Sequence, residues 1–339
     1  MSFSSVEVLN QAIKDAEVQI PLTSFETRFL HHQDDASKSL KRLLVIKEIH
    51  RNHPAISKGY DERRKLQEDN TNDLAFITDL TKQYSGTLEQ ISLGQGGALG
   101  NDRVHCFLDL GYFPGGFSSW LLENNPGAQG VGIDEKVLSE LTSDTPLRTN
   151  AHRYTTVASD IITLVLQAVE DGNDPIIPLG AKDGDTAVSN QYDLVIGCAF
   201  PGPRSPKPRG DIPWSTRPKL VLAQLLIILT NTKEGGRAIL HINTKPFAWI
   251  AEVIGVLWAC FADVGATGVS THKKSTSCYL ICSGFRGPND DTQTYKEQIR
   301  SMLYRLKSHP QEDGATDDPE QMMQTLSGRS LNNVFCRGA

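Results

Sequence analysis

The sequence predicts an α/β protein built on a parallel, doubly wound sheet. Between about residues 103 and 286, short apolar segments alternate with helical segments, which is the pattern of successive β-α units. The spacing from Asp109 to Asp134 to Asp160 is about one such unit each, and the acids stand at or near the ends of predicted strands. The last two predicted strands follow one another without a helix and form an antiparallel hairpin, which departs from a plain dinucleotide fold.

The first half of this region begins with the apolar run RVHCFLDL, which ends at a glycine turn and reads as a buried strand. The elements that we expect after it are a helix over 116–123, a strand GVGID ending at Asp134, a strand ending at Asp160, and a helix from Ile161.

The second half continues the alternation and closes with the hairpin. The elements are a strand from Tyr192, a proline-rich loop over 201–213, a helix over 219–230, a strand from Arg237, a helix over 248–261, and hairpin strands over 264–271 and 276–285. The turn KEGG precedes the strand from Arg237, and its glycines mark the change of direction.

The flanking segments differ from this region in composition, so we predict three parts. Residues 1–95 form a helical N-terminal region, residues 96–286 the α/β domain, and residues 287–339 a C-terminal helix over 294–307 with a polar tail. The tail sequence PQEDGATDDP has the low hydrophobicity of disordered segments.

Composition excludes several classes of protein. The 339 residues carry a formal net charge of −6, which disfavours a large RNA partner because phosphate binding usually needs a basic face. The N-terminus lacks a secretory signal, and the longest apolar runs, such as 220–229, are too short to span a bilayer. The six cysteines form no CxxC pair. We expect a reduced, cytoplasmic or nuclear protein that does not enter a membrane, and the oligomeric state is undefined.

A metal site is not predicted. The segment HHQDD, over 31–35, holds potential ligands, but adjacent residues of a helix point about 100° apart and are more typical of solvated surface.

The segment DLGYFPGGFSSWLLE, over 109–123, has the form of a strand end, a glycine turn and a helix start. Gly111 permits a positive φ and the close approach of a ligand to the backbone. A helix beginning near Gly115 and Gly116 offers free N–H groups and a partial positive charge to an anionic group.

The acids at the next strand ends extend this pattern. Asp134 is placed to accept hydrogen bonds from a ribose diol, and Asp160 to meet an adenine amino group. The sequence therefore predicts a site for an adenosine-containing ligand; the alternative is a βαβ unit with a tight turn and no ligand.

The ordered series of motifs resembles the FtsJ-like SAM-dependent methyltransferases, which methylate ribose 2′-hydroxyls of RNA. The matching segments, within 103–286, are DLGYFPGGFSSWLLE, GVGID, the pair Ser159 and Asp160, YDLVI, LAQLLIILTNTKEGGRAIL and SCYLICSGF. The resemblance implies a seven-stranded class I methyltransferase fold and S-adenosyl-L-methionine (SAM) as cofactor. It also implies a SAM pocket lined by Asp109, Gly111, Pro114, Gly115, Gly116, Asp134 and Asp160.

The family's catalytic tetrad is not retained. That tetrad is Lys-Asp-Lys-Glu, in which a lysine of lowered pKa helps deprotonate the hydroxyl. The positions of the aspartate, second lysine and glutamate match Cys198, His241 and Ser277 here. Lys41, or Lys38, is a loose match for the first lysine, because the gap to Asp109 is much longer than in the family.

Three functions remain open. The main prediction is a methyltransferase with a changed acceptor, such as a small molecule, in which His241 acts as general base and Cys198 shapes the pocket. Both side chains also have a purely structural interpretation. If the protein is a methyltransferase, we expect the loop 201–213 to help choose the substrate.

The second function is a catalytically inactive member that binds SAM, or nothing, and acts through a protein partner. The third, RNA 2′-O-methylation, is disfavoured by the acidic balance and the missing lysine. Tyr112 and Phe113 stand where the family has small residues. They would narrow the cofactor pocket, form an apolar wall for a substrate, or pack on the adjacent helix.

Overall fold

The computed structural model describes residues 35–52, 73–135, 146–179, 191–199, 215–243, 248–268 and 277–308, with isolated residues between 10 and 62. The chain divides into two compact units, Met1–Thr71 and Asn72–Ala339. The first unit contains the helix α3 (Asp35–Asn52). The second contains the sheet and the other helices that the structure describes.

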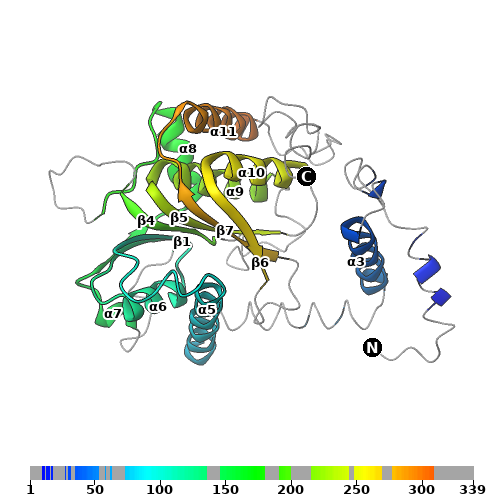
Figure 1. The fold of residues 1–339 in the computed structure, drawn as a ribbon, viewed down its shortest axis with the longest axis horizontal. Coiled ribbons are helices and arrows are strands. Elements are labelled where there is room, and N and C mark those ends of the chain that lie inside the picture. The colour runs from blue at the N-terminus through cyan, green and yellow to red at the C-terminus, as the bar shows by residue number, and fades with distance from the viewer. Residues whose placement is uncertain are drawn as a thin grey trace. The chain divides into compact units, whose positions relative to one another are not determined.

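The second unit is built on a seven-stranded sheet (Figure 1). Its strands are β1 (Cys106–Leu110), β2 (Gln129–Asp134), β3 (Tyr154–Ala158), β4 (Tyr192–Gly197), β5 (Thr232–Asn243), β6 (Phe261–Thr267) and β7 (Ser277–Phe285). Their order across the sheet is β3-β2-β1-β4-β5-β7-β6. The first five strands are parallel, whereas β7 runs antiparallel to both β5 and β6. The predicted doubly wound sheet and its final hairpin are confirmed.

Helices cover both faces of this sheet. They are α5 (Leu74–Gly94), α6 (Gly116–Asn124), α7 (Pro146–Thr149), α8 (Ile161–Glu170), α9 (Thr216–Asn231), α10 (Ala248–Cys260) and α11 (Asp290–Ser308). In Figure 1, α8, α9, α10 and α11 lie on one side of the sheet, and α5, α6 and α7 on the other. This arrangement follows from right-handed crossovers between parallel strands: the crossovers from β1 to β3 run in one direction along the sheet and cover one face, whereas those from β3 through β4 to β5 run in the other direction and cover the opposite face.

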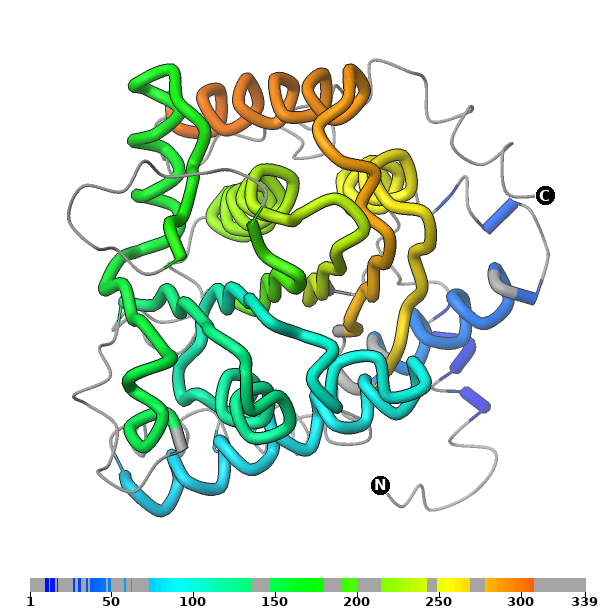
Figure 2. The backbone as a smooth tube through the Cα atoms, turned by 60° about the vertical axis from the view of Figure 1, so that its left-hand side comes forward, coloured from blue at the N-terminus to red at the C-terminus, as the bar shows by residue number. Residues whose placement is uncertain are grey.

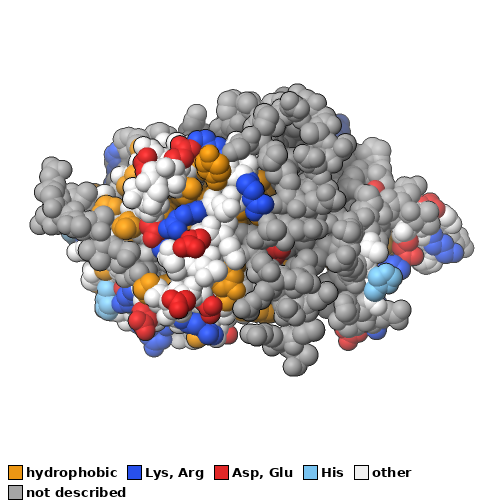
Figure 3. Space-filling model, turned by 90° about the horizontal axis from the view of Figure 1, so that it is seen from above, with side chains coloured by type: hydrophobic (Ala, Val, Ile, Leu, Met, Phe, Trp, Pro, Cys, Tyr) orange, Lys and Arg blue, Asp and Glu red, His pale blue; other side chains and the backbone are white. Residues whose placement is uncertain are grey.

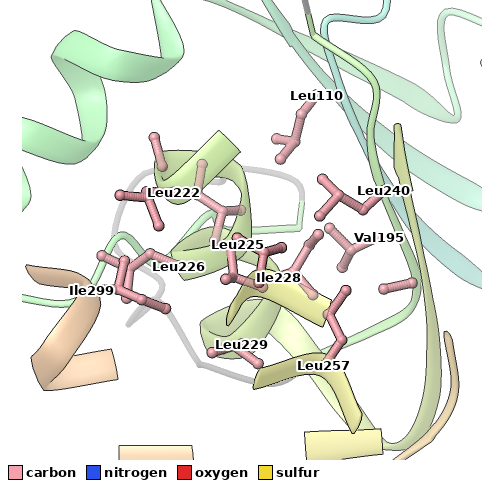
Figure 4. Packing of buried hydrophobic residues seen from close by; sticks show 14 of the residues in the cluster. Leu110, Val195, Leu222, Leu225, Leu226, Ile228, Leu229, Leu240, Leu257 and Ile299 are labelled. Atoms are coloured by element: carbon pink, nitrogen blue, oxygen red, sulfur yellow. The ribbon is translucent and has the colours of Figure 1, made fainter. Parts of the chain in front are cut away.

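The face under α9 is packed with aliphatic side chains, and we call its buried residues the aliphatic core. Figure 4 shows Leu222, Leu225 and Leu226 of α9 among side chains from the strands, such as Leu110 and Val195. Helix α9 is apolar on nearly all sides because α8, α10 and α11 surround it.

The opposite face, under α5 and α6, combines aliphatic side chains with a larger share of aromatic ones than the first face has, and we call its buried residues the aromatic core. Its aromatic members are Phe107, Tyr112, Phe113, Phe117, Trp120, Tyr154 and Tyr279. Two of the rings, those of Phe107 and Tyr154, stack with centroids 5.9 Å apart. The predicted pocket residues lie on this face or at its edge.

Helix α5 extends into the segment 92–102, for which the sequence suggests a loop. The helix begins at Asp73, whose carboxylate accepts hydrogen bonds from Ala75 N at 2.7 Å and Phe76 N at 3.2 Å, and it continues to Gly94. Figure 2 shows α5 beside α6, and the two helices are in contact. The last turn of α5 is helical because Leu88 and Ile91 are buried in the aromatic core.

Strand β1 begins later than the run RVHCFLDL suggests. The N–H groups of His105 and Cys106 both donate, at 2.7 Å, to the Asp193 carboxylate. The ladder with β2 begins at Cys106, opposite Gln129. A side chain therefore satisfies the backbone where the strand starts.

Candidate cofactor and acceptor site

A row of polar side chains crosses the aromatic face near the carboxyl ends of the parallel strands. Asp109 follows Phe107 by two residues in β1, and Cys198 follows Ile196 by two after β4. Because side chains alternate along a strand, both point to the face that carries the aromatic core. The row continues with Asp134 at the end of β2 and with His241 on β5. Carboxyl ends of parallel strands are where ligands bind in such sheets.

The turn after β1 accepts only glycine at position 111. Gly111 has φ 76°, and a Cβ there would lie 2.5 Å from Ala199 Cα. Its N–H donates to the Ile133 carbonyl at 2.7 Å. The positive φ predicted for this residue is present, and the turn lies directly against the chain that leaves β4.

The start of α6 is packed against α5. Gly115 precedes the helix in the left-handed conformation, with φ 97°, and no side chain caps the helix. A Cβ on Gly116 would collide with the Thr81 carbonyl oxygen and with Tyr84. The Thr81 hydroxyl also donates to the Pro114 carbonyl at 3.3 Å. Pro114, Gly115 and Gly116 are therefore buried, with α5 against one side of the turn.

Asp109 is completely buried beneath this turn. Its Oδ2 accepts a hydrogen bond from Ser118 Oγ at 2.6 Å, and Ser118 Oγ lies 2.8 Å from Tyr154 Oη. Because the serine proton is given to the carboxylate, the tyrosine is the donor in the second hydrogen bond. No residue within the described ranges forms a hydrogen bond with Asp109 Oδ1.

Burial raises the pKa of Asp109 to about 7, the Ser118 hydrogen bond opposes this shift, and the nearby charge of Asp134 adds to it. Near neutral pH this carboxyl therefore exists in both its charged and its neutral form. Such a group is sensitive to any charge that a ligand brings beside it.

Asp134 and Asp160 each accept a hydrogen bond from a backbone N–H group with one carboxylate oxygen. Asp134 Oδ2 accepts a hydrogen bond from Phe113 N at 3.3 Å, which ties the turn after β1 to the end of β2. Asp160 caps α8, and its Oδ2 accepts from Thr163 N at 2.9 Å and Thr163 Oγ1 at 2.6 Å. The ribose and adenine contacts expected of these acids remain predictions.

Tyr112 lies against the sheet, beside Gly132 and Tyr154. A Cβ on Gly132 of β2 would lie 2.7 Å from a ring carbon of Tyr112, and the Tyr112 ring meets Tyr154 edge-on at 5.9 Å. Phe113 is also buried in the aromatic core. Gly132 provides the space for a large ring where the family has a small residue.

The residues at two of the tetrad positions, Cys198 and His241, are buried in the same part of the domain as Tyr279. Cys198 is 6% exposed, His241 5% and Tyr279 1%. Burial raises the pKa of the Cys198 thiol well above its ordinary value; the Asp109 charge adds to the shift and the backbone N–H of His241 opposes it. The thiol is therefore neutral at pH 7. The His241 ring lies 4.7 Å from the Tyr279 ring, centroid to centroid.

Ser277 and Lys41 are not brought to Cys198 and His241 by the described contacts. Ser277 begins β7 and pairs with Asn243 of β5, and its side chain lies outside the described residues. Lys41 belongs to α3 in the first unit, where its ammonium lies 3.4 Å from a Glu17 carboxylate oxygen. The loop 201–213 also lies outside the described residues.

Tyr84 of α5 is a site residue that the sequence analysis missed. Its ring meets Phe117 edge-on at 5.3 Å, and Phe117 meets Tyr279 at 6.3 Å. Tyr84 also contributes to the raised pKa of Tyr279, for which burial is the main cause. The helical spacing of Ile77, Leu88 and Ile91, with Asp73 as cap, is the signal that would have identified α5 as part of this domain.

The residues present fit the predicted cofactor. Asp109 offers a buried oxygen with no partner among the described residues, and Asp134 lies at the neighbouring strand end. An acidic site suits SAM, which carries a positive sulfonium and a positive ammonium group.

No group of three or more His, Cys, Asp or Glu residues in the described ranges could hold a metal ion. None of the helices described here has both the length and the apolar composition for crossing a membrane. On the described part of the face in Figure 3, Lys and Arg side chains are interspersed with Asp and Glu.

Comparison with known proteins agrees with this geometry. A sequence model of the FtsJ-like methyltransferase family matches residues 90–285, which is more than half of the chain. No curated protein is similar enough to count as a match.

Solved structures of methyltransferases are similar to the chain at low sequence identity. Human methyltransferase-like protein 13, in complex with SAH, has a TM-score of 0.34 and 13% identity, over 70% of this chain and 99% of that one. A TehB-like SAM-dependent methyltransferase from Corynebacterium glutamicum has a TM-score of 0.32 and 13% identity, over 68% and 100%. The fibrillarin pre-rRNA processing protein of Methanococcus jannaschii has a TM-score of 0.33 and 10% identity, over 55% and 69%.

Proposed function

The chain belongs to the FtsJ-like methyltransferase family, and we propose that it is a member that binds SAM without catalysing methyl transfer. Family membership indicates SAM as the cofactor and the class I methyltransferase fold. The proposal concerns what the pocket does with that cofactor. It favours the second of the functions considered from the sequence over the first.

The observation that carries the proposal is the burial of the side chains at two tetrad positions, where a neutral thiol and an imidazole replace the carboxylate and the lysine. Deprotonation of a ribose hydroxyl in this family relies on charged lysine and carboxylate side chains, whereas the buried Cys198 and His241 stand there. The raised pKa of the Cys198 thiol keeps it neutral, so it is a poor base or nucleophile at pH 7.

The cofactor half of the site supports binding. Asp134 ends β2, where we expect the ribose hydroxyls; Gly111 and Gly115 have a positive φ in the turn, and Asp109 is an acidic group beside it. When bound, SAM would supply a methyl group activated by its sulfonium. The residues of this chain would orient the cofactor and exclude water from it.

The experiment is calorimetric titration of the purified chain with SAM and with S-adenosylhomocysteine (SAH). We expect binding, and we expect Asp134→Ala to weaken it at least about tenfold, because hydrogen bonds to a charged group contribute about 1.5–3 kcal/mol each. Asp171→Ala is the matched control, because Asp171 is an exposed acid at the C-terminal end of α8 and lies outside the proposed site. Absence of binding in the wild type would refute the cofactor half of the proposal.

The catalytic half is tested by turnover. The chain is incubated with labelled SAM, total RNA and a small-molecule extract, and SAH formation is compared with that of a His241→Ala, Cys198→Ala double variant. We expect equal background rates. Turnover in the wild type that the double variant lacks would refute the proposal and favour methylation of an acceptor other than ribose, with His241 as base.

RNA remains the weakest acceptor class. The net charge is −6, and the charges in Figure 3 are mixed. A protein partner acting through the segments that flank the domain is more consistent with a non-catalytic role.

A further inference from the structure

We propose that Asp109 makes this site selective for the sulfonium of SAM over the neutral sulfur of SAH, and that this selectivity is lost on mild acidification. The inference rests on the proposed cofactor binding. A protein with this property, and without turnover, would report how much SAM is present relative to its demethylated product. Such a role uses the buried acid and does not need the tetrad.

The first argument is that Asp109 is buried with an incomplete set of partners. Its Oδ2 accepts from Ser118, and Oδ1 has no hydrogen-bond partner among the described residues. No ion pair within those residues includes Asp109. A buried carboxylate without a cation is costly, so a ligand that brings positive charge beside it gains affinity.

The second argument is that no group facing Asp109 supplies that positive charge. The titratable neighbours are Asp134 from β2, Tyr154 from β3 and Cys198 after β4, and α6 contributes the Ser118 hydroxyl. The Tyr154 and Cys198 protons are held, because burial raises the pKa of both groups well above their ordinary values. The surroundings of Asp109 are therefore neutral or negative.

The third argument places the sulfonium near Asp109. In the strand order β2-β1-β4, Asp109 stands on the middle strand, between Asp134 on β2 and Cys198 after β4. In SAM the sulfur is bonded to the ribose 5′-carbon on one side and to the transferable methyl group on another. With the ribose at Asp134 and the methyl toward Cys198, the sulfur lies over β1. SAH keeps the ammonium and the carboxylate and loses only the sulfonium charge.

The pH dependence follows from the carboxyl itself. In the free protein the pKa of Asp109 is about 7, and an adjacent cation lowers it. Above that pH the carboxylate is already charged and the preference for SAM is complete. Below it, SAM binding must release a proton to the buffer, so the ratio of SAM affinity to SAH affinity falls by up to about tenfold per pH unit.

The experiment is titration of the full chain with SAM and with SAH, from about pH 6 to about pH 8, in two buffers of different ionisation enthalpy. We expect the preference for SAM to decrease toward low pH, with proton release on SAM binding near neutral pH. Asp109→Asn should retain SAH binding, lose most of the preference for SAM and show no change with pH. Asp171→Asn is the exposed-acid control and should behave as the wild type.

A second variant keeps the test decisive if Asp109→Asn does not fold. Ser118→Ala removes the hydrogen bond that favours the charged carboxylate, so the pH at which the preference is lost should move upward. Equal affinities for SAM and SAH at every pH, or an unchanged preference in Asp109→Asn, would overturn this inference and leave the proposed function intact. Failure of both ligands to bind the wild type would overturn the inference and the cofactor half of the proposed function together.

Discussion

The two faces of the sheet are built from different chemistry. The face under α8, α9, α10 and α11 is filled with aliphatic side chains and a few aromatic rings, and its buried polar side chains, such as Gln224 and Asn231 of α9, form hydrogen bonds with the backbone. The face under α5 and α6 has a larger share of aromatic rings among its aliphatic side chains, and a polar row that includes Asp109 and His241 crosses it.

The difference indicates that the face under α9 contributes mainly to stability, whereas the face under α5 and α6 also holds polar groups that are costly to bury. Apolar contacts need no orientation, so the aliphatic face maximises burial. A polar row inside an aromatic face costs free energy unless each group has a partner, and Asp109 lacks one at Oδ1 among the described residues. Such a cost persists where a ligand or a function requires it.

A large loss of stability is expected from a cavity in the aliphatic core. Leu226 of α9 is completely buried there, and Leu226→Ala should lower the free energy of unfolding by about 3 kcal/mol. SAM affinity of the folded variant should be unchanged, because the cavity lies on the far side of the sheet. Urea denaturation and calorimetry measure the two quantities; a loss of affinity equal to the loss of stability would mean that the faces are coupled.

The same contrast explains what could be predicted from the sequence. The elements around the aliphatic face were predictable, because runs such as 192–197 and 220–229 are long, apolar and bounded by turn residues. The positive φ at Gly111 was predictable from the local motif.

The missing details depend on contacts that are distant in sequence. Tyr84 meets Phe117 and Tyr112 fits over Gly132 only because α5 and β2 are brought there by the fold. No local pattern around Tyr84 marks it as a neighbour of Tyr279. The burial of Cys198 and His241 is likewise set by tertiary packing, so it could not be predicted from the sequence.

Smaller changes in stability, of opposite sign, are expected at Gly116, where α6 meets α5, and at Gly86 of α5. Gly116→Ala forces a methyl group into the Thr81 carbonyl and Tyr84, and overpacking of this kind costs about 2 kcal/mol. Gly86→Ala, within α5, meets nothing within 4 Å and should stabilise the helix by about 1 kcal/mol. Thermal or urea unfolding of the two variants measures both. Changes of the same sign would show that α5 is not held against α6 as described.

The last test compares the pH dependence of stability with and without the Asp109 carboxyl. Its pKa is raised from 3.8 to about 7 by burial, so between these values the folded chain holds a proton that the unfolded chain has released. The contribution of this group to stability is therefore greatest at low pH and falls as pH rises, by at most about 1.4 kcal/mol per pH unit, until the folded carboxyl ionises.

Asp109→Asn removes this contribution, so the difference in unfolding free energy between wild type and variant should shift in favour of the variant from about pH 4 to about pH 7 and stay constant above. Urea denaturation of the ligand-free proteins across this range measures the difference. A constant difference would mean that Asp109 is ionised and paired in the folded state. Burial of its carboxylate would then carry no free-energy cost, and in this respect the polar row would resemble the aliphatic face.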